Sequence, residues 1–360
     1  MSESYELIMD STNKIFKHYC TKELLDRAEN GHWPQELWDV LAEAGIISIG
    51  FSEQAGGVGG DYIDAYNILK LAGKYGVPVP LAETLIGKWL FAEVGGQVGD
   101  IPLTLALQND SNFSFVDEGD GYTLGGSASA VPWARYMEQI LICGDLNGKQ
   151  VAALVPLAHA EIREENNIAA EPRDSVIFSQ VKIDGLTVYQ VDSVLISEKS
   201  LYYLALAKAA MMAGAAERVM ELSLFYANER QQFGRSLHRF QGIQHHIASL
   251  AGETVACITA VNTAVQALQD GQYKTEIPLA KMKVSAASGK IAMAAHQLHG
   301  AIGMTYEHSL HHLTRRLWSW RDESGNESYW GSVLAKSLIE KNSPTLWEVL
   351  TDEQNLLIVD

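Results

Sequence analysis

The chain has 360 residues, of which 47% are hydrophobic, 20% charged and 9% aromatic. This length exceeds the usual size of one compact unit, so we expect two or three domains. There are 44 acidic and 27 basic residues, which gives a formal net charge of −17 at pH 7. Because a negative surface repels phosphate backbones and anionic lipid headgroups, this composition argues against binding to nucleic acid or to a membrane.

The cysteines and the N-terminus indicate a cellular setting. Cys20, Cys143 and Cys257 are far apart in the sequence and form neither a disulfide framework nor a metal-ligand spacing. The first ten residues, MSESYELIMD, lack the basic and then apolar run of a signal peptide. No stretch approaches the roughly 20 uncharged apolar residues that a membrane helix needs. We therefore expect a soluble, untargeted, cytoplasmic protein.

Residues 1–100 are predicted to form a helical domain. Residues 37–46 and 62–76 carry apolar side chains three and four positions apart, which is typical of helices packed on one face. The glycine cluster AGGVGG at 55–60 lies between them and predicts a loop. A phosphate-binding loop would follow a strand and be followed by GKS or GKT. The cluster at 55–60 has neither feature, so a structural loop is favoured.

Residues 101–195 change to short β-rich runs, and we expect a small antiparallel β domain. The predicted strands are 103–107, 112–116, 139–143 and 151–155. Asn147-Gly148 separates the last two, which is a strong signal for a tight hairpin.

Residues 196–360 return to a helical period and predict a four-helix bundle. Residues 200–228 are nearly all Ala, Leu, Met and Tyr, and apolar residues recur three and four apart from Ile243 to Leu268. Gly271 and then Pro278 predict a turn before the next helix. The fold class is therefore mainly α, with a small β domain in the middle. The long apolar surfaces exceed what one bundle buries alone, so we expect an oligomer.

The C-terminal region is rich in histidine. His308 and His312 are four residues apart with Glu307 adjacent, a spacing that can hold a metal. However, the HExxH pattern is absent, and we favour ordinary packing histidines and no metal site.

Two further stretches could carry chemistry. In the first, 227–250, Arg230, Arg235 and Gln241 lie where two helices meet at a Gly234 turn. Arginines at a helix carboxyl end interact favourably with the helix dipole, which explains the cluster without a ligand. Guanidinium groups also match phosphate oxygens, so a pyrophosphate ligand is an equally good explanation.

The second stretch, 296–330, combines glycine, tryptophan and acidic residues. They are Gly300, Gly303, Gly325, Trp318, Trp320, Trp330, Asp322, Glu323 and Glu327. Such a charged segment is usually a solvated loop. Indoles around a carboxyl group can instead raise its pKa towards the range of a general base.

Together these stretches resemble the C-terminal half of the acyl-CoA dehydrogenase family. ERQQFGRSLHRFQGIQHHIA and AHQLHGAIGMTYEHSLHHLTRR carry the resemblance. FSEQAGGVGG is similar to the family's PEE-x-GG-x-G loop, and YTLGGSASAVPWA to the segment that opens its middle β domain. The resemblance implies FAD, an acyl-CoA substrate oxidised between Cα and Cβ, homo- or heterotetramers built on the C-terminal bundle, and an electron-transferring flavoprotein as acceptor.

The resemblance also implies cofactor-binding residues. Arg230 and Phe233 match the ER-x-x-FG positions that reach the FAD of a neighbouring subunit, and Gln241 matches a glutamine eleven residues after that arginine. The family's Q-x-x-GG stretch lies against the adenine half of the cofactor. It is matched here by Gln297, Leu298, His299, Gly300 and Ala301, and Ala301 replaces the second glycine of the motif.

Other family positions differ here. The T-E-P-x-x-G-S-D segment that contacts the flavin ring is reduced to 103–112, and the WIT-type contact has become Ala130, Val131 and Pro132. Most members carry their base as a glutamate directly before a glycine, where a count without gaps from Gly303 places Ser324.

Two acidic residues are candidates for the base, and a third family position carries no acid here. Glu323 is the nearest acid to Ser324, and Asp322 is the runner-up. Some members place the base on the first long bundle helix, but the matching positions here are Leu204 and Ala205.

The leading functional hypothesis is an FAD-dependent acyl-CoA dehydrogenase with Glu323 as the catalytic base. The alternative is a non-catalytic subunit of a mixed tetramer that completes the FAD site of a partner. A third hypothesis is that the chain is a helical scaffold that binds no flavin. The acyl group remains open between fatty, branched, aromatic and sterol-derived chains.

Overall fold

The computed structural model describes residues 3–99, 101–107 and 111–340. The chain forms two compact units. The first joins residues 1–65 to 78–204, and the second joins residues 66–77 to 205–360.

The first unit begins with helices. They are α1 (Glu3–Tyr19), α2 (Lys22–Glu29), α3 (Gln35–Glu43), the start of α4 (Tyr62–Tyr75) and α5 (Leu81–Glu93). α5 is buried from Leu81 to Phe91, so it serves as the core helix of this unit. The glycine cluster is a loop, as predicted. A Cβ at Gly56 would lie 2.0 Å from the carbonyl oxygen of Val98, so the close approach of these two backbones requires glycine.

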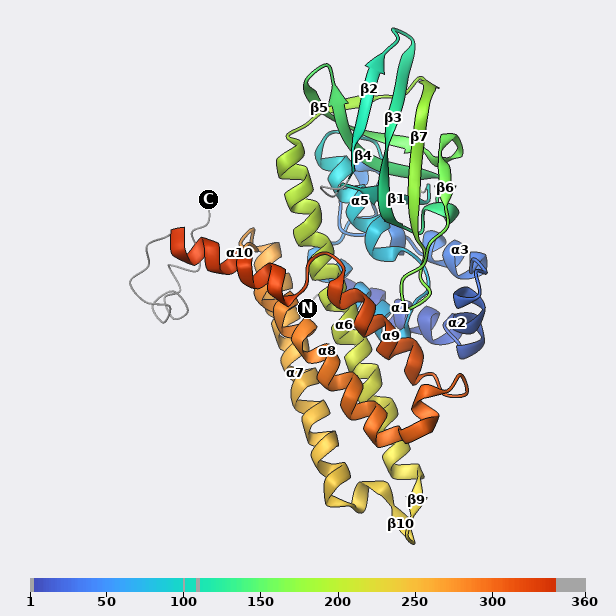
Figure 1. The fold of residues 1–360 in the computed structure, drawn as a ribbon, viewed down its shortest axis with the longest axis vertical. Coiled ribbons are helices and arrows are strands. Elements are labelled where there is room, and N and C mark those ends of the chain that lie inside the picture. Colours follow the sequence, from blue (N-terminus) through green and yellow to red (C-terminus); the bar gives the residue numbers. More distant parts are fainter. Residues whose placement is uncertain (1–2, 100, 108–110, 341–360) are drawn as a thin grey trace. The chain divides into compact units, whose positions relative to one another are not determined.

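The same unit contains the sheet (Figure 1). Its strands are β1 (Leu103–Ala106), β2 (Phe113–Asp117), β3 (Gly121–Pro132), β4 (Gln139–Leu146), β5 (Lys149–Pro156), β6 (Glu161–Arg163), β7 (Arg173–Asp184) and β8 (Val188–Gln190). The strand order is β6-β7-β3-β2-β4-β5-β8, with β1 also beside β4. The expectation of a purely antiparallel sheet needs correction, because β1 and β2 both run parallel to β4.

The predicted hairpin is confirmed. β4 and β5 pair from Gln139 with Pro156 to Leu146 with Lys149. Asn147 and Gly148 form the connection with φ of +54° and +80°. Positive φ at both positions matches the right-handed twist of the flanking strands, which is why Asn-Gly is favoured there.

The second unit is helical. It contains most of α6 (Ser193–Glu229), a small hairpin of β9 (Gln231–Gln232) and β10 (Arg235–Ser236), α7 (Gln241–Gln269), α8 (Glu276–His299), α9 (Leu310–Asp322) and α10 (Glu327–Glu340). α7 and α8 lie side by side, and α9 and α10 both pack on α8 (Figure 1). The mainly helical fold class, with N-terminal helices, a central β sheet and C-terminal helices, is confirmed. The three domains 1–100, 101–195 and 196–360 stay a prediction.

α7 is unusual in its composition. In the described part of the chain it is the one helix long and apolar enough to cross a membrane, although length and composition alone are weak grounds. Its Glu253 forms ion pairs with Lys283 and Lys290 of α8, at 2.6 and 3.0 Å. α7 is therefore a packed member of the helical unit.

Candidate functional site

The junction between α6 and α7 is a hairpin with an exposed tip. Gln232 pairs with Arg235, so Phe233 and Gly234 form a two-residue loop. Both have positive φ, +50° and +77°. Glycine adopts this conformation freely, whereas phenylalanine does so at a cost. The Phe233 side chain is 93% exposed.

The polar side chains around this hairpin are also exposed. Arg230 follows the last residue of α6, and Gln241 is the first residue of α7. Neither side chain forms a hydrogen bond or ion pair with any residue that the structure describes. The Arg235 guanidinium lies 4.1 Å from the centre of the Phe240 ring. The junction thus offers a cation, an amide and an aromatic ring without intramolecular polar partners.

The end of α8 divides into buried and exposed residues. Leu298 and His299 are buried, whereas Gln297, Gly300 and Ala301 are exposed. Gly300 ends the helix with φ of +64°, and a Cβ there would meet nothing within 4 Å. Of the residues predicted to line the adenine half of a cofactor, Gln297 is the one with an exposed polar side chain.

His299 has a supporting position. Its Nδ1 lies 2.8 Å from the carbonyl oxygen of Ala295, and its ring stacks on Tyr226 of α6 with centroids 4.6 Å apart. Burial lowers the pKa of His299 to about 4. The imidazole is therefore neutral at physiological pH and joins the ends of α6 and α8.

Glu323 lies at the carboxyl end of α9 and contacts Lys208 and Ser319. Its Oε2 is 3.0 Å from Nζ of Lys208 on α6, and its Oε1 accepts a hydrogen bond from Ser319 Oγ at 3.4 Å. The Lys208 side chain is only 3% exposed, and that of Glu323 is 21% exposed. The neighbouring Asp322 is exposed.

A second buried lysine lies next to this pair. Nζ of Lys281 on α8 donates to the carbonyl oxygens of Trp320 and Arg321, at 2.6 and 2.9 Å. Its side chain is completely buried. Sequence analysis identified neither Lys208 nor Lys281. For Lys208 the available signal was a lone lysine within an apolar helical run, since such a position predicts a buried cation with a partner. Lys281 lies two residues before Lys283, and no such signal marked it.

The positions that would touch a flavin ring lie in the first unit. Val131 is buried, and the carbonyl oxygen of Pro132 accepts a hydrogen bond from Thr104 Oγ1 at 2.6 Å. Pro132 has no N–H or hydroxyl group to offer a ligand. Residues 108–110 of the reduced T-E-P segment lie outside the described residues.

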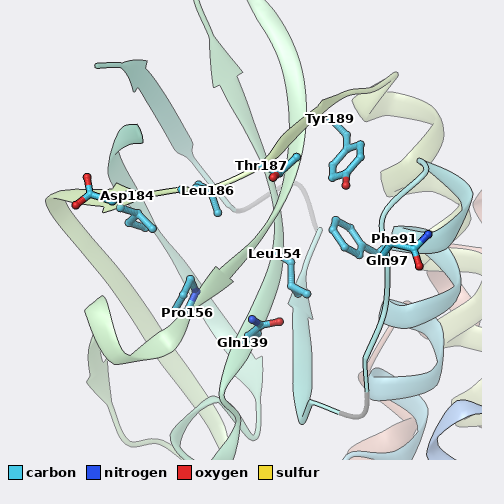
Figure 2. A pocket seen from close by; sticks show the side chains of 11 residues that line it. Phe91, Gln97, Gln139, Leu154, Pro156, Asp184, Leu186, Thr187 and Tyr189 are labelled. Carbon is cyan, nitrogen blue, oxygen red and sulfur yellow. The ribbon is translucent and has the colours of Figure 1, made fainter. Parts of the chain in front are cut away.

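A cavity of about 310 Å³ opens beside the sheet in the first unit (Figure 2). Phe91 of α5 and Tyr189 of β8 face it, with ring centroids 5.4 Å apart. The polar side chains in its lining are mostly neutral, among them Gln97 and Gln139. Its carboxylate, Asp184, pairs with Lys182 at the surface.

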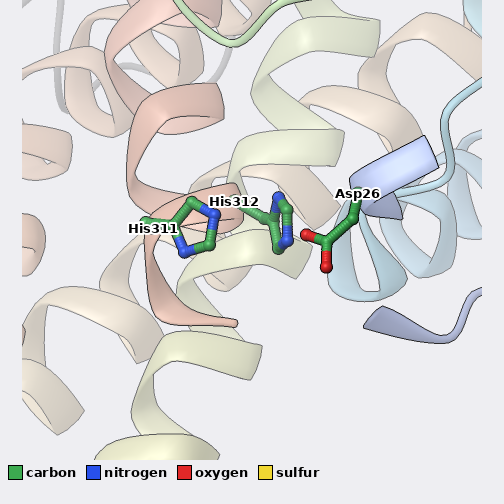
Figure 3. A group of neighbouring side chains, drawn as sticks. All are labelled: Asp26, His311 and His312. Carbon is green, nitrogen blue, oxygen red and sulfur yellow. The ribbon is translucent and has the colours of Figure 1, made fainter. Parts of the chain in front are cut away.

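His308, His311 and His312 lie at or near the start of α9. His311 and His312 are neighbours at the start of α9, with ring centroids 4.0 Å apart (Figure 3). His311 Nδ1 lies 2.7 Å from the carbonyl oxygen of His308. Asp26, drawn in the same figure, belongs to α2 of the first unit. The absence of a metal site stays a prediction.

Two models of one protein family match the chain. Residues 195–339 match the acyl-CoA dehydrogenase C-terminal domain, and residues 2–97 match the N-terminal domain. The chain belongs to the acyl-CoA dehydrogenase family. Among curated relatives it is similar to acyl-CoA dehydrogenase IpdE2 of Mycolicibacterium smegmatis, with 26% identity over 86% of this chain and 91% of that protein.

Two further proteins are informative. The caffeyl-CoA reductase-Etf complex subunit CarC of Acetobacterium woodii is 23% identical over 94% of this chain and 99% of its own length. The ChsE4-ChsE5 complex of Mycobacterium tuberculosis contains a chain with the same fold, with a TM-score of 0.85 and 18% identity over 96% of this chain and 99% of that chain. Family members form homo- or heterotetramers, and some act with an electron-transferring flavoprotein.

The family typically binds FAD, and this chain's residues fit one part of that group better than the other. Arg230 and Gln241 are exposed polar side chains without intramolecular partners, which suits an anionic pyrophosphate. Pro132, at the position of the flavin-ring contact, has no donor, and its carbonyl oxygen is already bonded. Arg230 and Gln241 would hold the pyrophosphate, whereas Pro132 would offer no donor to the flavin ring.

Proposed function

We propose that this chain is the non-catalytic subunit of a mixed acyl-CoA dehydrogenase assembly. In this assembly the chain completes the FAD site of a partner subunit, and the partner supplies the base. The bound FAD would accept a hydride from the β-carbon of an acyl-CoA thioester. An electron-transferring flavoprotein would then receive the electrons. The acyl group is fatty, branched, aromatic or sterol-derived.

The ion pair between Lys208 and Glu323 carries this proposal. A general base must take up a proton from substrate, and an adjacent ammonium ion opposes proton uptake by a carboxylate. Lys208 is buried, so water screens this attraction little. Glu323 is thus better suited to neutralise a buried cation than to act as a base.

The hairpin between α6 and α7 supports the proposal that this chain completes the FAD site of a partner subunit. Arg230, Phe233 and Gln241 have no polar partner within the described part of their own chain, yet Phe233 is kept in a strained conformation at an exposed tip. Such strain persists where an exposed side chain is needed. A cofactor held by a neighbouring subunit would provide the missing contacts.

The test compares the chain alone with the chain in its assembly. We would purify the full chain, incubate it with FAD and record the flavin spectrum before and after adding acyl-CoA thioesters of several lengths. We expect no bleaching of the flavin by any of them. Co-expression with a related acyl-CoA dehydrogenase chain that carries a glutamate before the matching glycine should restore bleaching.

Glu323→Gln separates this proposal from the self-sufficient enzyme. If the chain alone is bleached by an acyl-CoA and Glu323→Gln abolishes bleaching while FAD stays bound, Glu323 is the base and the proposal is wrong. If Asp322→Asn has that effect instead, the role belongs to Asp322. The absence of flavin from both the chain and the assembly would favour a scaffold.

A further inference from the structure

The cavity beside the sheet has no part in the proposed function. All the residues that line it belong to the first unit. Its volume of about 310 Å³ lies at the lower end of the range for small-molecule sites. The cavity is therefore large enough for one small ring compound.

The position of the cavity follows from the alternation of side chains along the strands. Ile140 of β4 packs in the hydrophobic core on one face of the sheet, so its neighbour Gln139 points to the opposite face. The pairing of β4, β5 and β8 places Leu154 and Tyr189 on the same face as Gln139. The cavity therefore opens on the face of the sheet opposite the core.

The lining offers hydrogen-bonding groups that the chain does not use. The neutral polar side chains in it form no hydrogen bond with any residue that the structure describes; they are those of Gln97, Gln139, Thr187 and Tyr189. Oε1 of Gln139 is also shielded from solvent, and Pro156, directly across the strand pair, has no N–H to donate to it. A shielded acceptor without a donor is costly, so a donor from a ligand would stabilise this wall.

The charge and shape of the lining select the class of ligand. None of the described residues that line the cavity is cationic, and its carboxylate, Asp184, pairs with Lys182 at the surface. A phosphate or carboxylate ligand would therefore lack a counter-charge. The rings of Phe91 and Tyr189 lie 5.4 Å apart at nearly a right angle and offer an aromatic wall (Figure 2). These features fit a neutral ring compound.

We propose that this cavity binds a small neutral cyclic amide, a ring in which an N–H donor lies next to a carbonyl acceptor. The Gln139 amide pairs with that edge: Oε1 accepts from the ring N–H, and Nε2 donates to the ring carbonyl oxygen. The terminal torsion of glutamine is broad, so both amide atoms can turn towards the ligand at little cost. Phe91 and Tyr189 pack against the ring. The site depends neither on FAD, nor on a partner subunit, nor on the proposed function.

The test compares three ligands on the full chain. Quinolin-2-one is a neutral bicyclic cyclic amide, 1-methylquinolin-2-one has a methyl group in place of its N–H donor, and quinoline-2-carboxylate carries a negative charge. Titration followed by NMR gives the affinities, and the side-chain amide resonance of Gln139 reports on the site. We expect quinolin-2-one to shift this resonance and to bind at least about tenfold more tightly than either of the others.

A pair of variants assigns the preference to one residue. Gln139→Leu keeps a side chain of similar size and removes the amide, so the two uncharged ligands should bind with nearly equal affinity. Gln97→Leu changes an exposed glutamine of the same lining and should keep the preference. If Gln139→Leu does not fold, the methylated ligand still tests the amide pair in the native chain.

Four results would overturn the proposal. They are a failure of quinolin-2-one to bind, equal affinities of the native chain for the two uncharged ligands, tighter binding of the carboxylate, and an unchanged preference in Gln139→Leu.

Discussion

The hairpin after α6 and the turn after α9 both match functional segments of the acyl-CoA dehydrogenase family, but they differ in how their side chains are satisfied. At the hairpin, Arg230 and Gln241 are exposed and have no polar partner among the described residues. At the turn, Glu323 is held by Lys208, and Lys281 by the end of α9. A site for another molecule keeps its groups free. The hairpin therefore fits a binding site, and the turn fits a structural role.

The difference also has an energetic meaning. A buried ion pair contributes little net stability, because desolvation of both charges offsets their attraction. Loss of one partner is costly, since it leaves the other charge buried and unpaired. Changes at the turn should therefore act on folding, whereas changes at the hairpin should act on binding.

The largest effect is expected for Glu323→Gln. It leaves the ammonium of Lys208 without its carboxylate and should lower the free energy of unfolding by about 3 to 5 kcal/mol. Denaturant unfolding of the full chain measures this. The double variant Lys208→Met/Glu323→Gln should recover part of the loss, because it removes the buried ammonium of Lys208 together with its carboxylate.

Glu253→Gln is the matched control. Its side chain is 19% exposed, close to the 21% of Glu323, but its partners Lys283 and Lys290 are 37% and 62% exposed. Solvated lysines tolerate the loss of a partner, so the cost should be at most about 1 kcal/mol. Equal losses in Glu253→Gln and Glu323→Gln would remove the contrast between buried and exposed pairs.

A second test concerns the buried support beside the hairpin. Burial lowers the pKa of His299 to about 4 in the folded chain, below its ordinary value of 6.5. The unfolded chain therefore binds a proton first, and stability is lost as the pH falls from 6.5 towards 4. This group should contribute about 1.4 kcal/mol per pH unit in that window, or about 3 kcal/mol in total.

His299→Phe keeps a ring against Tyr226 and removes the titration. The free energy of unfolding of this variant should fall less steeply below pH 6.5 than that of the native chain. His245→Gln, at an exposed position of α7, should leave the native slope. Identical slopes in the native chain and in His299→Phe would show that the imidazole is not shielded from protons.

Local patterns were readable from the sequence, and tertiary partners were not. Asn147-Gly148 specified its hairpin because the required positive φ is a property of those two residues. The mixed sheet was missed because strand direction depends on the whole topology. Glu323 was identified from its distance to a family motif, but its partner Lys208 lies on a helix far away in the sequence. No periodicity connects the two.

The third prediction returns to the hairpin. Arg230→Ala should weaken FAD binding in the assembly by about ten- to a hundredfold, the effect of losing about 1.5 to 3 kcal/mol from a charge-assisted contact. Helix content and the free energy of unfolding should not change, because Arg230 has no partner among the described residues. Flavin retained after dialysis measures the effect.

Arg218→Ala provides the control for Arg230. Arg218 is a half-exposed arginine on α6, the helix that ends just before Arg230, and it pairs with Glu221 at 2.8 Å. Its loss should leave flavin content unchanged. Full flavin occupancy in Arg230→Ala would show that this guanidinium does not bind the pyrophosphate.

The smallest effect, and the most specific one, is expected at Phe233. The side chain is 93% exposed and the backbone has φ of +50°, so Phe233→Gly removes a ring that stabilises little within the chain and relieves a strained backbone. The isolated chain should become more stable by up to about 1 kcal/mol. FAD retention by the assembly should fall by about two- to tenfold, since an aromatic contact contributes about 0.5 to 1.5 kcal/mol. The control Phe225→Ala removes a 68% exposed ring from α6. It should neither raise the stability of the isolated chain nor lower FAD retention by the assembly. If Phe233→Gly stabilises the chain and retains FAD fully, the strain at the tip of the hairpin has no role in binding, and Phe233 leaves the predicted cofactor site.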